Sequence, residues 1–345
     1  MKITTQKVVN GWQLYTLTNE HKMSVSILDY GGIITEINVP DRHNNLKNVV
    51  LGFKNYADYE HNLNFLGALV GRVAGRIQDA RLTIQGLTYE LDVNEGTHHI
   101  HGGSNGFHQL IWASTPFQTE EAVGVILRHT SPDGEGGYPG TVDVTVTYTL
   151  TNNNELQIDY DATSDKKTAL TLTNHSYFNL SGNPATAIDQ HHVTVNSDAI
   201  IELDKDLIAT GKMLDVTNTP FDFRKGRLLA DGIQSTFPQN IIASHGYDHY
   251  FLFNDEHRGS IQVRDDISGR VLSINTTHPG VVMYTANCLD EGLELTGGPS
   301  IKYGGVCFET QASPASLQYE NLPTILLDAH VPYEKQTVFT FFVAE

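Results

Sequence analysis

Hydrophobic and polar residues alternate with a period of two along much of this chain. Residues 140–150 (GTVDVTVTYTL) show the pattern clearly, with valine, tyrosine and leucine on one face and aspartate and threonine on the other. Such alternation is typical of a half-buried antiparallel strand. The run 156–162 (LQIDYDA) follows the polar turn 151–155, so the two runs are predicted to form a hairpin.

Similar signals recur from one end of the chain to the other. Residues 81–91 (RLTIQGLTYEL) have Gln85 and Gly86 at their centre, which predicts a second hairpin. Further strands are predicted at 25–28, 33–39, 122–129, 192–195, 260–264, 271–275, 281–284 and 338–343. Long helical patterns are lacking, although residues 55–64 could form a turn or two.

Thirty glycines and twelve prolines punctuate these short runs, which indicates a sandwich or barrel. No repeat, low-complexity segment or Pro/Ser/Gly-rich linker divides the chain. We therefore expect an all-β fold, mostly antiparallel, in which residues 1–345 form one large β-sandwich domain with less than about 15% helix.

Composition narrows the possible functions. The 345 residues include 40 acidic and 22 basic side chains, a net charge of −18 with histidine neutral. That excess disfavours nucleic-acid binding and attachment to anionic lipid, both of which need cationic clusters. It also disfavours a phosphorylated substrate.

The expected location is the cytoplasm. Two cysteines, Cys288 and Cys307, cannot form a disulfide framework, which fits a reducing compartment. The first residues have no apolar core typical of a signal peptide, and no run approaches 18 apolar residues.

Histidine is frequent, with 16 in the chain, and three lie within NEGTHHIHGG at residues 94–103. Alternation would place His99 and His101 on one face, and the glycine pair that follows lets backbone approach a ligand closely. The three histidines could be metal ligands, but no further ligand stands at a recognised spacing, so no metal site is expected. His98, and with it His99, could equally be solvated loop residues.

Two other segments combine polar chemistry with strand-like alternation. In LTNHSYFNL (172–180), His175 and Tyr177 share a polar face, either an exposed strand face or the floor of a pocket. In GGVCFETQ (304–311), Cys307, Glu309 and Gln311 share one face and Val306 and Phe308 the other. Glu309 is either an edge-strand side chain facing water or a carboxylate with a raised pKa that acts as a base.

Two further positions stand out. Asp248 precedes an apolar strand within HGYDHYFLF, and VGRVAGRI (70–77) carries Arg72 and Arg76. Such arginines could fork onto hydroxyls or a carboxylate, or form surface ion pairs. No GxSxG, P-loop or GxGxxG motif stands before a predicted strand–helix unit, which removes the commonest hydrolase and nucleotide-binding classes, and calcium-loop motifs are missing too.

Together these segments resemble the aldose 1-epimerase (galactose mutarotase) family. The similarity covers essentially the whole chain, in the family's order. It comprises VAGRI (73–77), NEGTHHIHGG (94–103), DGEGGYPG (133–140), NHSYFNL (174–180), GYDHYF (246–251), MYTAN (283–287) and CFETQASP (307–314). The resemblance implies a large, mostly antiparallel β-supersandwich, in agreement with the strand pattern.

The resemblance also implies roles for individual residues. Glu309 matches the family's catalytic base and His175 its acid, while His101 matches a second histidine that hydrogen-bonds the sugar near its ring oxygen. Arg76 and Asp248 match residues that hold the sugar hydroxyls. Tyr177 would line the site, and Tyr284 stands where an aromatic ring packs on the sugar in some members. One departure is Gly75, where many members have Asn before the arginine.

These residue types suit the reaction that the family implies. Opening a hemiacetal removes a proton from the C1 hydroxyl and delivers one to the ring oxygen, and closure reverses both transfers. Unperturbed pKa values of about 4.3 and 6.5 would leave Glu309 ionised and much of His175 neutral at pH 7. A neighbouring carboxylate would favour the protonated imidazole. No cofactor is needed.

The expected function is therefore an isomerase acting on a reducing sugar, galactose or glucose, with neither nucleic acid nor membrane as partner. An epimerase of a disaccharide such as maltose is the alternative within enzymes, and a hexose 6-phosphate mutarotase is disfavoured by the charge. A catalytically silent carbohydrate-binding module would not need both Glu309 and His175. A glycosidase would need two flanking carboxylates, and Asp248 is better suited to hydroxyl recognition. The preferred sugar, the choice between monomer and homodimer, and any structural ion stay open.

Overall fold

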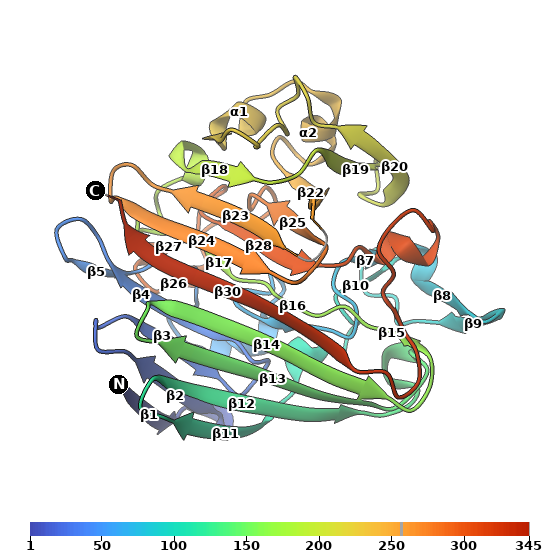
Figure 1. Cartoon of the computed structure of the whole chain (residues 1–345), viewed down its shortest axis with the longest axis horizontal. Helices are drawn as coiled ribbons and strands as arrows, with labels where there is room; N and C mark the ends of the chain where they lie inside the picture. The colour runs from blue at the N-terminus through green and yellow to red at the C-terminus, as the bar shows by residue number, and fades with distance from the viewer. Residues whose placement is uncertain (256–257, 345) are drawn as a thin grey trace.

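β-Strands make up most of the secondary structure (Figure 1). The structure is a computed structural model that describes residues 1–255 and 258–344. Within these residues the α-helices are α1 (Ala230–Ile233) and α2 (Pro238–Ile242), which lie together at the top of Figure 1. The predicted all-β, mostly antiparallel fold is confirmed, and little of the described chain is helical.

The largest sheet has nine antiparallel strands, seen in front in Figure 1. In spatial order they are β11 (Ala113–Gln118), β12 (Ala122–Ser131), β13 (Val142–Thr151), β14 (Glu155–Ser164), β30 (Tyr333–Val343), β24 (Arg270–Thr276), β23 (Gly259–Arg264), β18 (His192–Val195) and β21 (Arg227–Leu228). The predicted long hairpin is β13–β14, paired from Val142 opposite Ser164 to Leu150 opposite Leu156. Its alternating apolar side chains are buried, as the period of two predicted.

Two smaller sheets complete the layers. One has six strands in the order β17 (Tyr177–Phe178), β28 (Val306–Gln311), β25 (Gly280–Tyr284), β22 (Asp248–Leu252), β19 (Ala199–Leu203) and β20 (Ala209–Asp215). The other runs in chain order through β1 (Lys2–Lys7), β2 (Gln13–Thr18), β3 (Ser24–Leu28), β4 (Ile34–Pro40) and β5 (Leu46–Asn48).

Short strand pairs and 3-10 turns close the edges of these sheets. The pairs are β6 (Leu69–Val70) with β16 (Thr173–Asn174), β7 (Arg76–Ile77) with β10 (His99–Ile100), β8 (Arg81–Ile84) with β9 (Leu87–Glu90), β15 (Thr168–Ala169) with β29 (Leu326–Leu327), and β26 (Glu294–Leu295) with β27 (Gly298–Pro299). The 3-10 turns are Val9–Gly11, Tyr56–His61, Gln78–Ala80, Phe107–Gln109, Glu135–Gly137, Ile188–Gln190 and Pro314–Leu317.

Two of these short elements match local predictions. The β8–β9 hairpin turns at Gln85 and Gly86, both at positive φ (52° and 79°), as a two-residue hairpin turn requires. The turn or two expected within 55–64 is the 3-10 segment Tyr56–His61.

The core lies where the six-stranded sheet packs against the nine-stranded one. Phe178 of β17 contacts Phe308 of β28 and both Phe339 and Phe341 of β30, with ring centroids 5.4–6.5 Å apart. Burying such a side chain contributes about 1.5–3 kcal/mol. Because neighbouring residues on a strand point to opposite faces, the residue after Phe308 is turned away from this core.

Arg72, one of the two arginines of VGRVAGRI, serves the fold. Its guanidinium is buried and donates to the Ser131 hydroxyl at 2.7 Å and to the carbonyl oxygens of Pro132 (2.7 Å) and Gly140 (2.8 Å). It therefore fixes the loop that carries DGEGGYPG and forms no surface ion pair.

Candidate active site

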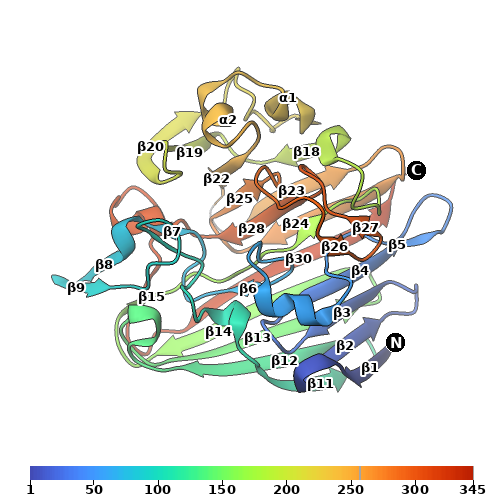
Figure 2. The same ribbon diagram turned by 180° about the vertical axis from the view of Figure 1, so that it is seen from behind.

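One cavity of about 290 Å³ is lined by all seven residues to which the family resemblance gave a role. They are Arg76, His101, His175, Tyr177, Asp248, Tyr284 and Glu309. Figures 1 and 2 both place β7 beside one end of β28, and β10 pairs with β7, so the cavity lies between these short strands and the six-stranded sheet.

The six-stranded sheet aligns several of these residues by its register. Asp248 pairs with Tyr284, Tyr284 with Cys307, and Cys307 with Tyr177, a row across four neighbouring strands. Glu309 is two residues beyond Cys307 and so shares its face. Alternation thus directs Val306 and Phe308 to the core and Glu309 to the cavity, as the sequence predicted.

Glu309 lies on an inner strand, since β28 has β17 on one side and β25 on the other. The interpretation of an edge-strand carboxylate facing water is therefore wrong, and only 3% of the residue is exposed. Burial raises the pKa of Glu309 to about 8, although the charge of Arg76 opposes the shift. Removing water disfavours the charged form of a carboxylate, and here that cost exceeds the attraction to the arginine.

His175 stands between two short strands and not within one. The predicted continuous strand over LTNHSYFNL is divided into β16 and β17, and the whole segment is buried, so an exposed polar face is ruled out. The backbone stays anchored because the His175 N–H donates to the Ala68 carbonyl (2.8 Å) and its carbonyl accepts from Gly67 (3.1 Å).

The His175 ring faces Glu309 with one nitrogen and a thiol with the other. Its Nε2 is 3.6 Å from Oε1 of Glu309, and its Nδ1 is 3.5 Å from Sγ of Cys307. Burial lowers the pKa of His175 to about 4, while the charge of Asp248 raises it. A neighbouring carboxylate thus favours the imidazolium, as expected, but desolvation outweighs the attraction and the ring is neutral at pH 7.

The three histidines of NEGTHHIHGG do not act together. Strand β10 ends at Ile100, and His101 adopts a positive φ of 52°, so His99 and His101 point to different places. His99 is fully buried, with ring contacts to the Asp92 carbonyl (2.7 Å) and the Tyr138 hydroxyl (2.6 Å), so a solvated role for it is wrong. His98 accepts a hydrogen bond from the Asp79 amide at 3.0 Å.

His101 faces the cavity in a fixed orientation. Its Nδ1 accepts a hydrogen bond from the Gly75 amide at 3.2 Å, which leaves Nε2 for other partners. Burial lowers the pKa of His101 well below its usual value, with a further contribution from His175. A neutral ring at this place can bind a sugar oxygen without carrying charge.

Arg76 is held by two carboxylates. Its Nε and Nη2 donate to the two oxygens of Glu95 at 2.6 and 2.8 Å, and its Nη1 is 3.6 Å from Oδ2 of Asp248. Burial raises the pKa of Asp248 to about 6, against the charge of Arg76. Asp248 is thus paired incompletely, and its carboxylate can still accept hydrogen bonds from a ligand.

Glu95 and Phe65 also belong to the site, and sequence reasoning missed both. Glu95 stands inside NEGTHHIHGG, a segment in which only the histidines were considered as candidates. Phe65 lies in a loop with a positive φ of 54°, unusual for a bulky residue, and nothing in the sequence marks it. Its ring packs on His101, His108 and His175 at centroid distances of 4.6, 4.8 and 5.9 Å.

The two tyrosines present rings to the cavity, because their hydroxyls are occupied. The Tyr177 hydroxyl donates to the Asn64 carbonyl (2.9 Å), and the Tyr284 hydroxyl accepts from the Cys288 amide (3.0 Å). The departure from the family pattern at Gly75 has a local basis, because its φ of 88° favours glycine. A Cβ there would lie 3.1 Å from Pro314 and 3.2 Å from Gln311.

The sequence suggested His98, His99 and His101 as possible metal ligands, but the structure groups other residues. Donor atoms of His101, His175 and Glu309 lie within 4.8 Å of one another. Two imidazoles and a carboxylate can bind a divalent cation. The same three groups can also move protons, so the expectation that no metal is needed stays a prediction.

Both cysteines are free, Cys288 exposed and Cys307 buried, in keeping with the expected lack of a disulfide framework. Among the described residues, no helix has the length and apolar character needed to cross a membrane.

Comparisons with known proteins show which family the chain is similar to. The aldose 1-epimerase family model matches residues 13–340. Galactose mutarotase of Mus musculus is 40% identical over 326 residues, 94% of this chain and 92% of the mouse protein. Maltose epimerase of Levilactobacillus brevis is 32% identical, covering 93% of this chain and 92% of the relative.

A solved structure shows the same fold. The galactose 1-epimerase of Lactobacillus acidophilus superposes with a TM-score of 0.87 at 28% identity, covering 100% of this chain and 99% of that one. Because the family model and relatives above 30% identity span nearly the whole sequence, the chain belongs to the aldose 1-epimerase family, an isomerase family.

Proposed function

We propose that this protein interconverts the α and β anomers of a reducing hexose, galactose or glucose, by opening and closing the sugar ring. The observation that carries the proposal is the buried pair Glu309–His175, with 3.6 Å between Oε1 and Nε2, beside the hydroxyl-binding groups Arg76 and Asp248. The galactose mutarotases among the relatives support the choice of sugar.

In the proposed reaction, Glu309 and His175 transfer one proton each. The Glu309 carboxylate takes the proton of the C1 hydroxyl while Nε2–H of His175 protonates the ring oxygen. The bond between C1 and the ring oxygen breaks, and the aldehyde forms. After rotation about the C1–C2 bond, closure on the other face of the carbonyl returns both protons. Each such transfer is typically worth about 10²–10⁴ in rate.

The electrostatics of the cavity support a single exchangeable proton on this pair. With the pKa of Glu309 raised to about 8 and that of His175 lowered to about 4, the proton that the pair shares lies on Glu309 at pH 7. Ring opening ends in the same state, with neutral His175 and protonated Glu309. Arg76 favours the ionised carboxylate and Asp248 favours the imidazolium, so these two charges make the starting state of ring opening accessible.

The remaining site residues would hold the sugar. Arg76 and Asp248 would bind hydroxyls, and Nε2–H of His101 would donate to an oxygen near the ring oxygen. The rings of Tyr177 and Tyr284 would pack against the sugar. Glu95, which holds Arg76 through two hydrogen bonds, would orient that arginine. None of these roles requires a cofactor.

A disaccharide such as maltose is the second candidate substrate. Apart from its polar groups, the cavity is lined by Leu63, Ile201, Leu207, Ile208 and Leu317, an apolar wall on which a second sugar ring could pack. The maltose epimerase among the relatives supports this alternative. A silent carbohydrate-binding module is less consistent with the site, because burying Glu309 is costly and binding alone does not require it.

We also propose that the chain works as one domain in the cytoplasm, as a monomer or homodimer. The family model that spans residues 13–340 supports the single domain. The two free cysteines support a reducing compartment.

Polarimetry on freshly dissolved α-galactose, α-glucose and α-maltose tests the function directly. The protein should accelerate the approach to anomeric equilibrium, most strongly for one of the three sugars. If none of the three equilibrates faster than it does without protein, the proposal is wrong.

A further inference from the structure

Cys307 lies next to His175 in a buried position that the proposed reaction leaves unexplained. It is fully buried on β28, two residues before Glu309 and on the same face of the sheet. Its Sγ is 3.5 Å from Nδ1 of His175, within hydrogen-bonding range for sulfur. Burial raises the pKa of the thiol well above its usual value, so the sulfur is an uncharged S–H group at neutral pH.

The packing around His175 fixes the plane of the ring, but it does not decide which of the two ring edges faces Cys307. Phe65 is stacked near it with ring centroids 5.9 Å apart, Tyr177 is tilted against it at 5.0 Å, and His101 meets it edge-on at 5.4 Å. A half-turn about the Cβ–Cγ bond exchanges a nitrogen for a carbon at each position and leaves the shape almost unchanged. Only hydrogen bonds can distinguish the two orientations.

The contacts of the two nitrogens make this distinction. Nδ1 is near the sulfur of Cys307, whose lone pairs can accept an N–H hydrogen bond. Nε2 faces the carboxyl group of Glu309, and with the pKa of Glu309 raised to about 8 this group is protonated at pH 7 and can donate its O–H to Nε2. With the proton of the neutral ring on Nδ1, Nε2 carries a lone pair and can exchange a proton with the sugar.

We propose that Cys307 is a positioning residue that accepts the Nδ1–H hydrogen bond of His175 and so keeps Nε2 as the proton-exchanging atom. The assignment of a catalytic role to His175 rests on the proposed function, but its tautomer and orientation do not. A thiol suits the task because sulfur is a weak, neutral acceptor. It can hold both the neutral ring and the imidazolium, whereas a carboxylate would favour the charged form.

The variants Cys307→Ala and Cys307→Ser separate positioning from packing. Ala removes the acceptor, and Ser keeps one with nearly the same shape. We expect kcat to fall by about tenfold in Cys307→Ala, with KM nearly unchanged because Arg76 and Asp248 still hold the sugar. Ser should recover most of the loss. The matched control is Val306→Ala, which removes buried volume from the adjacent position on the core face and should lower stability without moving kcat.

The tautomer of His175 can be measured without any sugar by long-range ¹H–¹⁵N correlation NMR at pH 7. The parent protein and Cys307→Ser should show the proton on Nδ1. Cys307→Ala should show a substantial Nε2–H population. Glu309 and His101 contact this ring, and the charges of Asp248 and His108 interact with it, so the same measurement repeated across pH should follow these four groups too.

An unchanged tautomer in Cys307→Ala, or equal kcat losses for Ala and Ser, would overturn the proposal. If Cys307→Ala does not fold, an Nε2–H tautomer in the parent protein overturns it by itself, and an Nδ1–H tautomer in both the parent and Cys307→Ser supports it. Failure of the proposed epimerase function would appear differently, as a protein with the expected tautomer and no effect on the anomers.

Discussion

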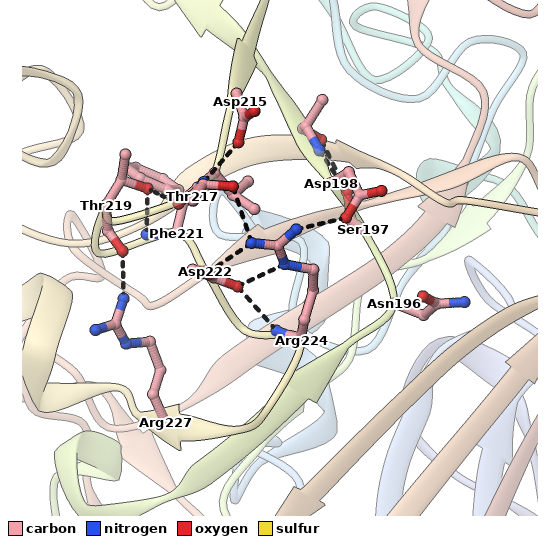
Figure 3. Close-up of polar contacts among 12 residues, drawn as sticks. Asn196, Ser197, Asp198, Asp215, Thr217, Thr219, Phe221, Asp222, Arg224 and Arg227 are labelled. Carbon is pink, nitrogen blue, oxygen red and sulfur yellow. Dashed lines mark hydrogen bonds and ion pairs between the residues drawn. The ribbon is translucent and has the colours of Figure 1, made fainter.

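Two arginines of this protein bridge carboxylates in the same way, yet their surroundings give them different uses. Arg76 forks onto Glu95 and approaches Asp248. Arg224 forks onto Asp222, with Nε and Nη2 each at 2.8 Å, and reaches Asp198 through Nη1 at 2.8 Å. Figure 3 shows the Arg224 network, to which Thr217 adds a further acceptor.

The two networks differ in how completely their charges are paired and in the exposure of the second carboxylate, which is 62% for Asp198 and 16% for Asp248. The side chains of Arg224, Asp222 and Asp198 are 33%, 28% and 62% exposed, and the hydrogen bond to Arg224 lowers the pKa of Asp222. In the cavity, the contact between Arg76 and Asp248 is 3.6 Å long, and burial raises the pKa of Asp248 to about 6. The charges of the surface network are paired with one another. In the cavity, the desolvated Asp248 carboxylate can still accept hydrogen bonds from a ligand. A bridging arginine seen in a sequence therefore does not mark a site by itself.

The largest difference between the two networks should appear when the basic oxygen in the cavity is removed. Glu309→Gln keeps the shape of the side chain, and kcat should fall by at least about 10², on the scale of general acid–base catalysis. His175→Asn should have a similar effect, and the double variant should lose far less than the product of both losses, because the two residues act as a unit. A coupled galactose dehydrogenase assay measures each rate.

The surface network supplies the control for that experiment. Asp222→Asn changes a carboxylate of the same kind, bonded to an arginine in the same geometry, and should leave kcat and KM unchanged. Near-parent kcat in Glu309→Gln would remove Glu309 as the base and, with it, the proposed reaction.

The pH dependence should reveal the single proton shared in the cavity. Below about pH 4 both Glu309 and His175 are protonated, and above about pH 8 neither is. The value of kcat/KM should therefore fall at both ends of this pH range. Outside this window we expect kcat/KM to fall about tenfold per pH unit, with the apparent values belonging to the pair. Within the window, protonation of Asp248 below about pH 6 adds a separate loss through KM. A profile that rises through pH 8 would contradict a base with a raised pKa.

Asp248 should affect binding more than chemistry. Asp248→Asn leaves a neutral acceptor, and KM should rise by about tenfold, as expected for losing a charged hydrogen bond to a hydroxyl. Because the pKa of Asp248 is raised to about 6, the KM of the parent should also rise as the pH falls through this value. The variant should lack that rise, and initial rates at several sugar concentrations measure it. An unaltered KM would place the hydroxyl-binding role elsewhere.

The smallest expected effect is that of chelation. Hemiacetal opening needs only proton transfers, so dialysis against EDTA should leave the rate unchanged, despite the grouping of His101, His175 and Glu309. Activity that disappears on dialysis and returns with zinc would show that these residues hold a catalytic metal.

Alternation allowed much of the sheet structure to be predicted from the sequence. The β13–β14 and β8–β9 hairpins follow from side-chain pattern and turn residues, and both are local properties of the chain. Short strands with little pattern of their own, such as β16 and β17, were merged into one, because their pairing with β6 and β28 depends on segments distant in sequence.

The chemical character of the candidate site was also visible in the sequence. Its residue types stand in motifs that resemble those of the family, and alternation assigned Glu309 and Phe308 to opposite faces. Glu95 and Phe65 were missed because the first is defined by its contact with Arg76 and the second by its packing on three histidines. Neither contact exists until distant segments meet.

The period of the strands can be predicted from the sequence alone, as can the two hairpins, the excess of acidic residues and the identity of the groups that could move protons. How those groups ionise depends on the tertiary structure. Burial depends on the whole arrangement of sheets. It raises the pKa of Glu309 to about 8, so the carboxyl group that unperturbed values leave ionised at pH 7 holds a proton, and it lowers the pKa of His175 to about 4. The same burial distinguishes Arg76 from Arg224, because the cost of removing water from a charge is set by the surrounding fold and not by neighbours along the chain.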